Sequence, residues 1–108
     1  MSSGPLPKSV ALAKEVAPKF ADVTMNVLFD DVWERPGLNK RDRSLITVAA
    51  LLSLYRIEQL PYHLKLALEN GVTKEELGEA IAHLAFYASW PCASSAIAIA
   101  KKVFDETA

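Results

Sequence analysis

The sequence contains almost no cysteine, and its single thiol, Cys92, limits the chemistry available to the chain. One cysteine excludes an internal disulfide, a Cys-x-x-Cys redox pair and a cysteine-rich zinc site. Chains that use so little cysteine are typical of reducing compartments. We therefore expect a cytoplasmic protein with no structural metal.

An excess of charge and a long hydrophobic run are also missing. The net charge is -1, from 12 Lys and Arg against 13 Asp and Glu, and the basic residues are dispersed among acidic ones. This pattern argues against nucleic acid as a partner. No apolar stretch is long enough to cross a bilayer, and residues 1–5 lack the basic and apolar regions of a signal peptide. We expect neither export nor membrane insertion.

Hydrophobic residues, in contrast, are abundant. They make up 51% of the 108 residues, while only 23% are charged. A chain of this length forms one domain and buries only a modest share of its surface when it is alone. The excess of apolar residues therefore predicts that the protein associates with copies of itself.

The apolar residues recur at helical spacing, with no strand pattern and no internal repeat. Residues 1–7 contain Ser, Gly and two prolines and predict a flexible N-terminal arm, followed by a single domain over residues 8–108. The pattern predicts an all-α fold of five to six helices joined by short turns. The expected helical stretches are Lys8 to Trp33 with a break at Pro18, Asn39 to about Tyr55, Gln59 or Leu60 to Asn70, Thr73 to Tyr87, and Pro91 to about Phe104.

Two local signals define helix ends. Thr73 followed three residues later by Glu76 is a capping box, and Asn70-Gly71 is a helix stop. The helix containing residues 45–54 is apolar on nearly all sides, which predicts that other elements cover it on several sides. One subunit can hardly supply that cover, so this helix also favours self-association.

Three blocks of sequence carry a family resemblance. They are residues 33–38 followed by 41–51, residues 59–64 leading into 67–73, and Glu79 with residues 83–91. Over roughly residues 20–105 they resemble the carboxymuconolactone decarboxylase family. The resemblance implies an all-α, alkylhydroperoxidase-D-like fold and a ring-shaped homo-oligomer, usually a trimer or a hexamer.

The family has a thiol peroxidase branch and a cofactor-free decarboxylase branch. The thiol branch carries Cys-x-x-Cys-x-x-x-His, and aligning its histidine with His63 puts Arg56 and Gln59 at the cysteine positions and Ser44 near an upstream glutamate. Disulfide chemistry needs an attacking and a resolving thiol, which Cys92 alone does not provide. The decarboxylase branch therefore fits better.

That branch implies a cofactor-free decarboxylase of a small cyclic dicarboxylate such as 4-carboxymuconolactone, in aromatic catabolism of the protocatechuate and 3-oxoadipate type. Two alternatives remain open. One is a hydroperoxide reductase with peroxiredoxin-like activity, from the same superfamily. The other is a non-catalytic oligomer that binds a small molecule.

Decarboxylation of such a lactone leaves an enolate that must be stabilised and protonated, beside a carboxylate that stays on the product. His63 is the candidate proton donor, since a histidine titrates near neutral pH. Glu58 is the candidate that orients the imidazole or relays the proton, and Arg43 the candidate that holds a carboxylate through two hydrogen bonds. The alternatives are a hydrogen-bonded packing histidine, a solvated acid and a structural ion pair.

Further substrate-binding candidates are Arg41, Arg56, His83, Tyr87 and Trp90. For either arginine the alternative is a structural ion pair. Glu79, His83 and Tyr87 recur every four residues on one helix face, which is typical of a proton relay but also of a polar ladder at an interface. No second cluster completes a metal site with Glu79 and His83, so no metal is expected. Trp90 is either a wall of the pocket or part of the core.

Overall fold

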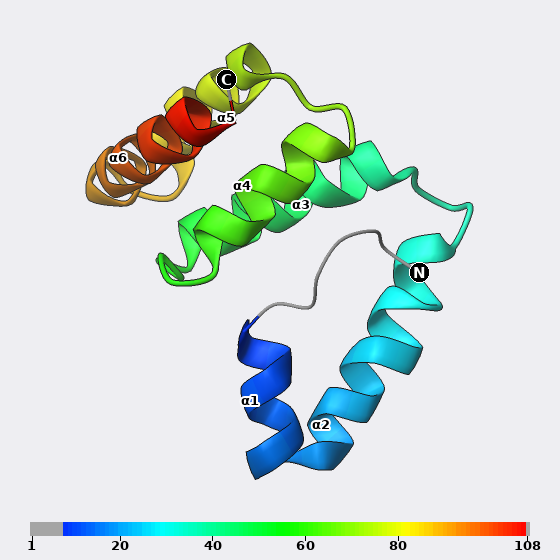
Figure 1. Cartoon of the computed structure of the whole chain (residues 1–108). Helices are drawn as coiled ribbons and strands as arrows, with labels where there is room; N and C mark the ends of the chain where they lie inside the picture. Colours follow the sequence, from blue (N-terminus) through cyan, green and yellow to red (C-terminus); the bar gives the residue numbers. More distant parts are fainter. Residues whose placement is uncertain (1–7, 108) are drawn as a thin grey trace. The chain divides into compact units, whose positions relative to one another are not determined.

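The computed structural model describes residues 8–107, and within them only helices and their connections occur (Figure 1). The predicted all-α class is confirmed, with six α-helices and two short segments of π- and 3₁₀-helix. The predicted arm at residues 1–7 lies outside the described residues. The chain divides into two compact units, one ending at Lys40 and the other beginning at Arg41. No described helix is both long and apolar enough to span a bilayer.

The first unit comprises α1 (Lys8–Val16), α2 (Pro18–Val23), a π-helical segment η1 (Thr24–Phe29) and a 3₁₀ segment η2 (Val32–Glu34). The predicted break falls at Pro18, which occupies the first position of α2, where its missing N–H costs nothing. Phe29 and Trp33 stack with ring centroids 6.2 Å apart. The change to a π-helix at Thr24 was not predicted. There the Thr24 hydroxyl donates to the Phe20 carbonyl at 2.7 Å, a side-chain bond of the kind that competes with the backbone hydrogen bonds of a regular turn.

The second unit begins at Arg41, the second residue of α3 (Lys40–Ser53). It continues with α4 (Leu60–Glu69), α5 (Lys74–Tyr87) and α6 (Trp90–Glu106). All four helices contribute to one apolar core. The alanines that α6 contributes to this core let α6 approach α4 and α5 closely. The buried members of this core are Val48, Leu52, Leu60, Leu64, Ala67, Val72, Leu77, Ile81, Ala93, Ala96, Ala100 and Val103.

Specific contacts fix the helix directions in this unit. Lys74 Nζ at the start of α5 donates to the Phe104 carbonyl near the end of α6, 3.1 Å away, so α5 and α6 are antiparallel. The Asn70 side chain just after α4 donates to the hydroxyl of Ser44 near the start of α3, at 2.9 Å. Because Ser44 is fully buried, this bond satisfies a hydroxyl that has no access to water. It also shows that α3 and α4 are antiparallel.

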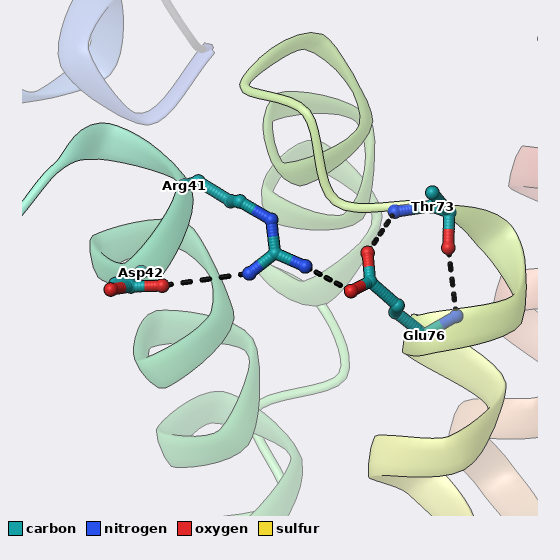
Figure 2. A network of polar contacts seen from close by, with 4 residues as sticks. All are labelled: Arg41, Asp42, Thr73 and Glu76. Atoms are coloured by element: carbon teal, nitrogen blue, oxygen red, sulfur yellow. Dashed lines mark hydrogen bonds and ion pairs between the residues drawn. The ribbon is translucent and has the colours of Figure 1, made fainter.

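The predicted capping box at the start of α5 is confirmed (Figure 2). The Glu76 amide donates to the Thr73 hydroxyl at 3.0 Å, and the Thr73 amide donates to Glu76 Oε1 at 2.9 Å. Arg41 at the start of α3 forms an ion pair with Glu76 and lies 3.5 Å from Asp42 Oδ1. The hydrogen bond from the Thr73 amide, followed by that from Arg41, lowers the pKa of the Glu76 carboxyl. The network therefore ties the first turns of α3 and α5 together.

The end of α3 has an unusual residue. The Arg56 amide donates to the Leu51 carbonyl at 2.8 Å and the Tyr55 amide to the Leu52 carbonyl at 3.1 Å, the bonding pattern of a Schellman helix end. Tyr55 has φ +58°, the left-handed conformation that glycine adopts freely and that costs other residues about 1–2 kcal/mol. At the end of α4, by comparison, the predicted stop uses Gly71, with φ +102°.

The α3 helix buries one face within the described chain. Ser44, Val48 and Leu52 are buried on that face, whereas Ile46 and, just past the end of the helix, Leu54 are exposed. The sequence predicted cover on several sides of this helix. Cover of its outer side by another subunit stays a prediction.

Candidate active site

His63 stands in the first turns of α4, at the edge of the core. It lies between Tyr62 and the fully buried Leu64, and its ring meets that of Tyr62 edge-on with centroids 5.1 Å apart. The side chain is half-buried and its Nδ1 atom is shielded from solvent. Burial lowers the pKa of His63, because the low-dielectric surroundings disfavour the imidazolium. The free protein therefore holds a neutral imidazole at pH 7.

Two other predicted residues lie directly before α4, in the loop formed by residues 54–59. The Leu60 amide, the first of α4, donates to the Arg56 carbonyl at 3.2 Å, so one hydrogen bond joins the backbone at Arg56 to the start of α4. Arg56 therefore lies in the loop at the N-terminal end of α4, and His63 is the fourth residue of that helix. Arg56 and Glu58 are both exposed. The guanidinium and the carboxylate are thus carried by the loop that leads into the helix of the imidazole.

Arg43, predicted to act with His63, lies at the other end of the α3–α4 pair. Arg43 directly precedes Ser44, whose hydroxyl accepts a hydrogen bond from the Asn70 side chain. Asn70 in turn lies seven residues after His63 in the chain. Since the two helices are antiparallel, Arg43 and His63 are separated by about 10 Å along the helix axes. The Arg43 side chain is half-buried, and the backbone carbonyl of Arg43 accepts a hydrogen bond from the Thr47 hydroxyl at 2.7 Å. The described chain does not bring Arg43 into the first turn of α4.

Arg41 is engaged in the network that joins α3 to α5 (Figure 2). Its guanidinium lies between Glu76 and Asp42. This geometry matches the alternative of a structural ion pair. The principal partner, Glu76, lies 35 residues further on. A role of Arg41 in substrate binding stays a prediction.

The remaining predicted residues form a separate aromatic cluster where α5 ends and α6 begins. The His83 and Tyr87 rings stack with centroids 4.8 Å apart, and Phe86 meets Trp90 edge-on at 5.8 Å. The ladder of Glu79, His83 and Tyr87 is exposed to solvent. Among residues 8–107 no group of three or more His, Cys, Asp or Glu side chains is placed to hold a metal ion.

One residue near the site was missed in the sequence. Tyr55 immediately precedes Arg56, and its Oη atom lies 3.4 Å from Ser95 Oγ on α6. The only signal was its position, directly after the last apolar residues of α3, where glycine is the usual helix-ending residue. Tyr62 was quoted in the family resemblance but given no role, and its burial raises the pKa of its phenol.

A family model for the carboxymuconolactone decarboxylase family matches residues 18–102. The chain belongs to the carboxymuconolactone decarboxylase family. The matched region contains His63, Arg56, Glu58 and Arg43, so the whole N-terminal end of α4 lies within the family domain. The family resemblance inferred from the sequence blocks is confirmed.

Three curated relatives show how this family member compares with named proteins. The chain is 41% identical to the 4-carboxymuconolactone decarboxylase of Acinetobacter baylyi over 87 residues, which are 81% of this chain and 65% of that protein. It is 35% identical to the nitrosuccinic acid decarboxylase npaB of Metarhizium robertsii over 75 residues, 69% of this chain and 52% of that protein. An uncharacterized 15.0 kDa protein of Paracoccus denitrificans is 26% identical over 95 residues, 86% of this chain and 71% of that protein. The match therefore spans just under two thirds of the first relative and about half of the second.

The lowered pKa of His63 predicts a pH dependence of stability. Above the unfolded-state pKa of about 6.5 both states are neutral, and His63 adds no pH dependence. As the pH falls through about 6.5, the unfolded chain takes up a proton that the folded chain refuses, so the free energy of unfolding decreases until the pH reaches the lower folded-state pKa. Urea unfolding of the wild type and a His63→Gln variant between pH 8 and pH 5 should show the smaller decrease in the variant. An equal decrease in the free energy of unfolding of both proteins over this pH range would contradict a buried, neutral His63.

Proposed function

We propose that this protein is a decarboxylase of a small cyclic dicarboxylate such as 4-carboxymuconolactone, as in aromatic catabolism of the protocatechuate and 3-oxoadipate type. The observation that carries the proposal is a half-buried imidazole in α4 and an exposed arginine in the loop that leads into this helix, both inside the matched family domain. Two relatives bear the names of decarboxylases that act on different acids. This supports the reaction class more firmly than it supports one substrate.

The reaction divides into a bond cleavage and a proton transfer. The bond between the ring carbon and one carboxylate breaks, carbon dioxide leaves, and the electron pair moves into the conjugated lactone carbonyl as an enolate. A ring carbon then takes up a proton and the carbonyl is restored. One carbon dioxide is released and one proton consumed for each lactone, with no oxidant or reductant.

His63 supplies that proton in the proposed mechanism. The free imidazole is neutral because burial lowers its pKa, and an arriving dicarboxylate raises the pKa again through its opposing charge. The proton is therefore taken up when the anion binds. Glu58, five residues earlier, relays the proton or orients the imidazole.

Arg56 is the arginine of the same chain that we propose for the carboxylate that remains on the product. It lies in the loop directly before α4, the helix of His63, and its exposed guanidinium can donate two parallel hydrogen bonds to a carboxylate. The corresponding role of Arg43 stays a prediction, because Arg43 lies at the opposite end of α4. We also propose that the reaction needs no metal or organic cofactor, since the lactone carbonyl itself accepts the electron pair.

Self-association belongs to the same proposal. Phe86 is 80% exposed and Trp90 66%, and Leu12, Val16 and Phe20 of the first unit are also exposed. Large apolar side chains that gather on a surface mark interaction sites. We propose that copies of this chain cover them, in a trimer or a hexamer. Light scattering at dilute concentration tests this, and a well-folded monomer would contradict it.

Carbon dioxide release tests the reaction itself. Protein treated with EDTA and freshly prepared 4-carboxymuconolactone should yield one trapped carbon dioxide for each lactone consumed. In Arg56→Gln the KM should rise about 10- to 100-fold, the usual effect of losing a charge-assisted hydrogen bond of about 1.5–3 kcal/mol. Arg43→Gln is the matched comparison. If it raised the KM while Arg56→Gln did not, the roles assigned to the two arginines would be reversed.

A further inference from the structure

Tyr55 occupies a backbone position that favours glycine. Among residues 8–107 it is the one residue other than glycine with a positive φ, and it ends α3 with the two hydrogen bonds of a Schellman motif. Its side chain is 50% exposed, so burial of the ring does not account for a tyrosine here. Residues kept in strained conformations are often found where a side chain has a functional task.

The side chain reaches a distant helix. Tyr55 Oη lies 3.4 Å from Ser95 Oγ, the length of a long and weak hydrogen bond, and the two residues are 40 positions apart in the chain. Ser95 is adjacent to Ala96, which is buried in the core. The contact therefore joins the 54–59 loop to a rigid part of α6.

The same loop carries two residues of the proposed site. Arg56 follows Tyr55 directly, and Glu58 lies two residues further on. Both side chains are exposed, as is that of Ile57 between them. The loop backbone is held at Arg56, whose amide bonds α3 and whose carbonyl bonds the first residue of α4. The Tyr55 side chain adds an anchor to α6 immediately before this residue.

We propose that Tyr55 is a positioning residue for the active site, which uses its left-handed backbone and its contact with Ser95 to hold Arg56 and Glu58 beside the first turn of α4. The inference rests on the proposed decarboxylase function of this site. Tyr55 acts through Arg56, which binds the substrate, more than through His63, which is anchored separately in α4. Loss of the anchor therefore affects KM more than kcat.

Kinetics of four variants test the catalytic part of this inference. Tyr55→Phe and Ser95→Ala should each raise the KM for 4-carboxymuconolactone about three- to tenfold with a smaller change in kcat, the effect of losing one neutral hydrogen bond. The double variant should be no worse than the more affected single variant, since both remove the same contact. Ser94→Ala, on the exposed face of α6, is the control and should match the wild type. Additive effects, or an unchanged KM in both single variants, would overturn the inference.

Amide hydrogen exchange tests the anchor without depending on turnover. The amides of Arg56 and Leu60 should exchange several-fold faster in Tyr55→Phe and Ser95→Ala than in the wild type or Ser94→Ala, while amides in the core of α4 stay unchanged. If the wild type did not consume the lactone but these exchange rates still rose in the variants, the proposed decarboxylase function would be wrong. The anchoring of the loop by Tyr55 would then still be supported. Unchanged exchange at both amides would overturn the anchor whatever the kinetics.

A Tyr55→Gly variant separates the backbone from the side chain. Glycine accepts the left-handed conformation without strain, so the urea midpoint should be equal to or above that of the wild type. The KM should nevertheless rise at least as much as in Tyr55→Phe. A wild-type KM in Tyr55→Gly would show that the phenol has no positioning role.

Discussion

Replacing His63 by alanine should lower kcat for 4-carboxymuconolactone by about 10²- to 10⁴-fold, the usual contribution of a positioned general acid or base. The variant retains Arg56 and Glu58, so the KM should change much less. In His63→Ala the enolate must take its proton from water, which is neither positioned nor matched in pKa. Initial rates over a range of lactone concentrations measure kcat and KM separately.

Lys65→Ala is the matched control for this variant. Lys65 lies two residues after His63 on α4, is exposed, and its Nζ is 3.8 Å from Glu106 Oε1 at the surface. It should retain wild-type kcat. Equal kcat values for His63→Ala and the wild type would remove His63 from the mechanism and leave a different acid to be found.

Truncating Leu64 should cost about 2–5 kcal/mol of the free energy of unfolding. Leu64 has no exposed surface and belongs to the core to which all four helices of the second unit contribute. Leu64→Ala leaves a cavity that packed helices cannot fully close. Urea unfolding monitored by circular dichroism measures the loss, and the midpoint should fall clearly below that of the wild type.

The adjacent position again supplies the comparison. Lys65→Ala removes a surface ion pair, which is worth about 0–1 kcal/mol. If Leu64→Ala cost no more than Lys65→Ala, the core assigned to the second unit would be wrong.

Features that depend on neighbouring residues could be predicted from the sequence. The capping box of Thr73 and Glu76 lies within one helical turn. The stop at the end of α4 depends on a single residue, Gly71, which takes the left-handed conformation. Both were predicted because the residues that form each feature lie in one short segment. The four helices of the second unit were predicted for the same reason, from apolar periodicity between recognisable ends.

Features that depend on tertiary contacts could not be predicted in this way. Arg41 pairs with Glu76, 35 residues away, and Tyr55 reaches Ser95, 40 residues away. No local pattern specifies such partners. The π-helix at residues 24–29 likewise has no sequence signature comparable to a capping box.

The candidate site illustrates both cases. His63 was predicted from its place in a family motif, whereas its burial and the direction of its pKa shift required the packing of α4. In the sequence Arg43 was the first candidate to hold a substrate carboxylate, and Arg56 was a further one. The antiparallel pairing of α3 and α4 then placed Arg43 beside the C-terminal end of α4, whereas Arg56 lies in the loop before its N-terminal end.

The most direct test of the decarboxylase assignment is the ultraviolet progress curve of freshly prepared 4-carboxymuconolactone with wild-type protein from which metals have been removed. The account predicts that the substrate band disappears at a rate proportional to protein concentration, with no added cofactor. A flat trace at high protein concentration would contradict the assignment of this substrate, although the family and the fold would stand.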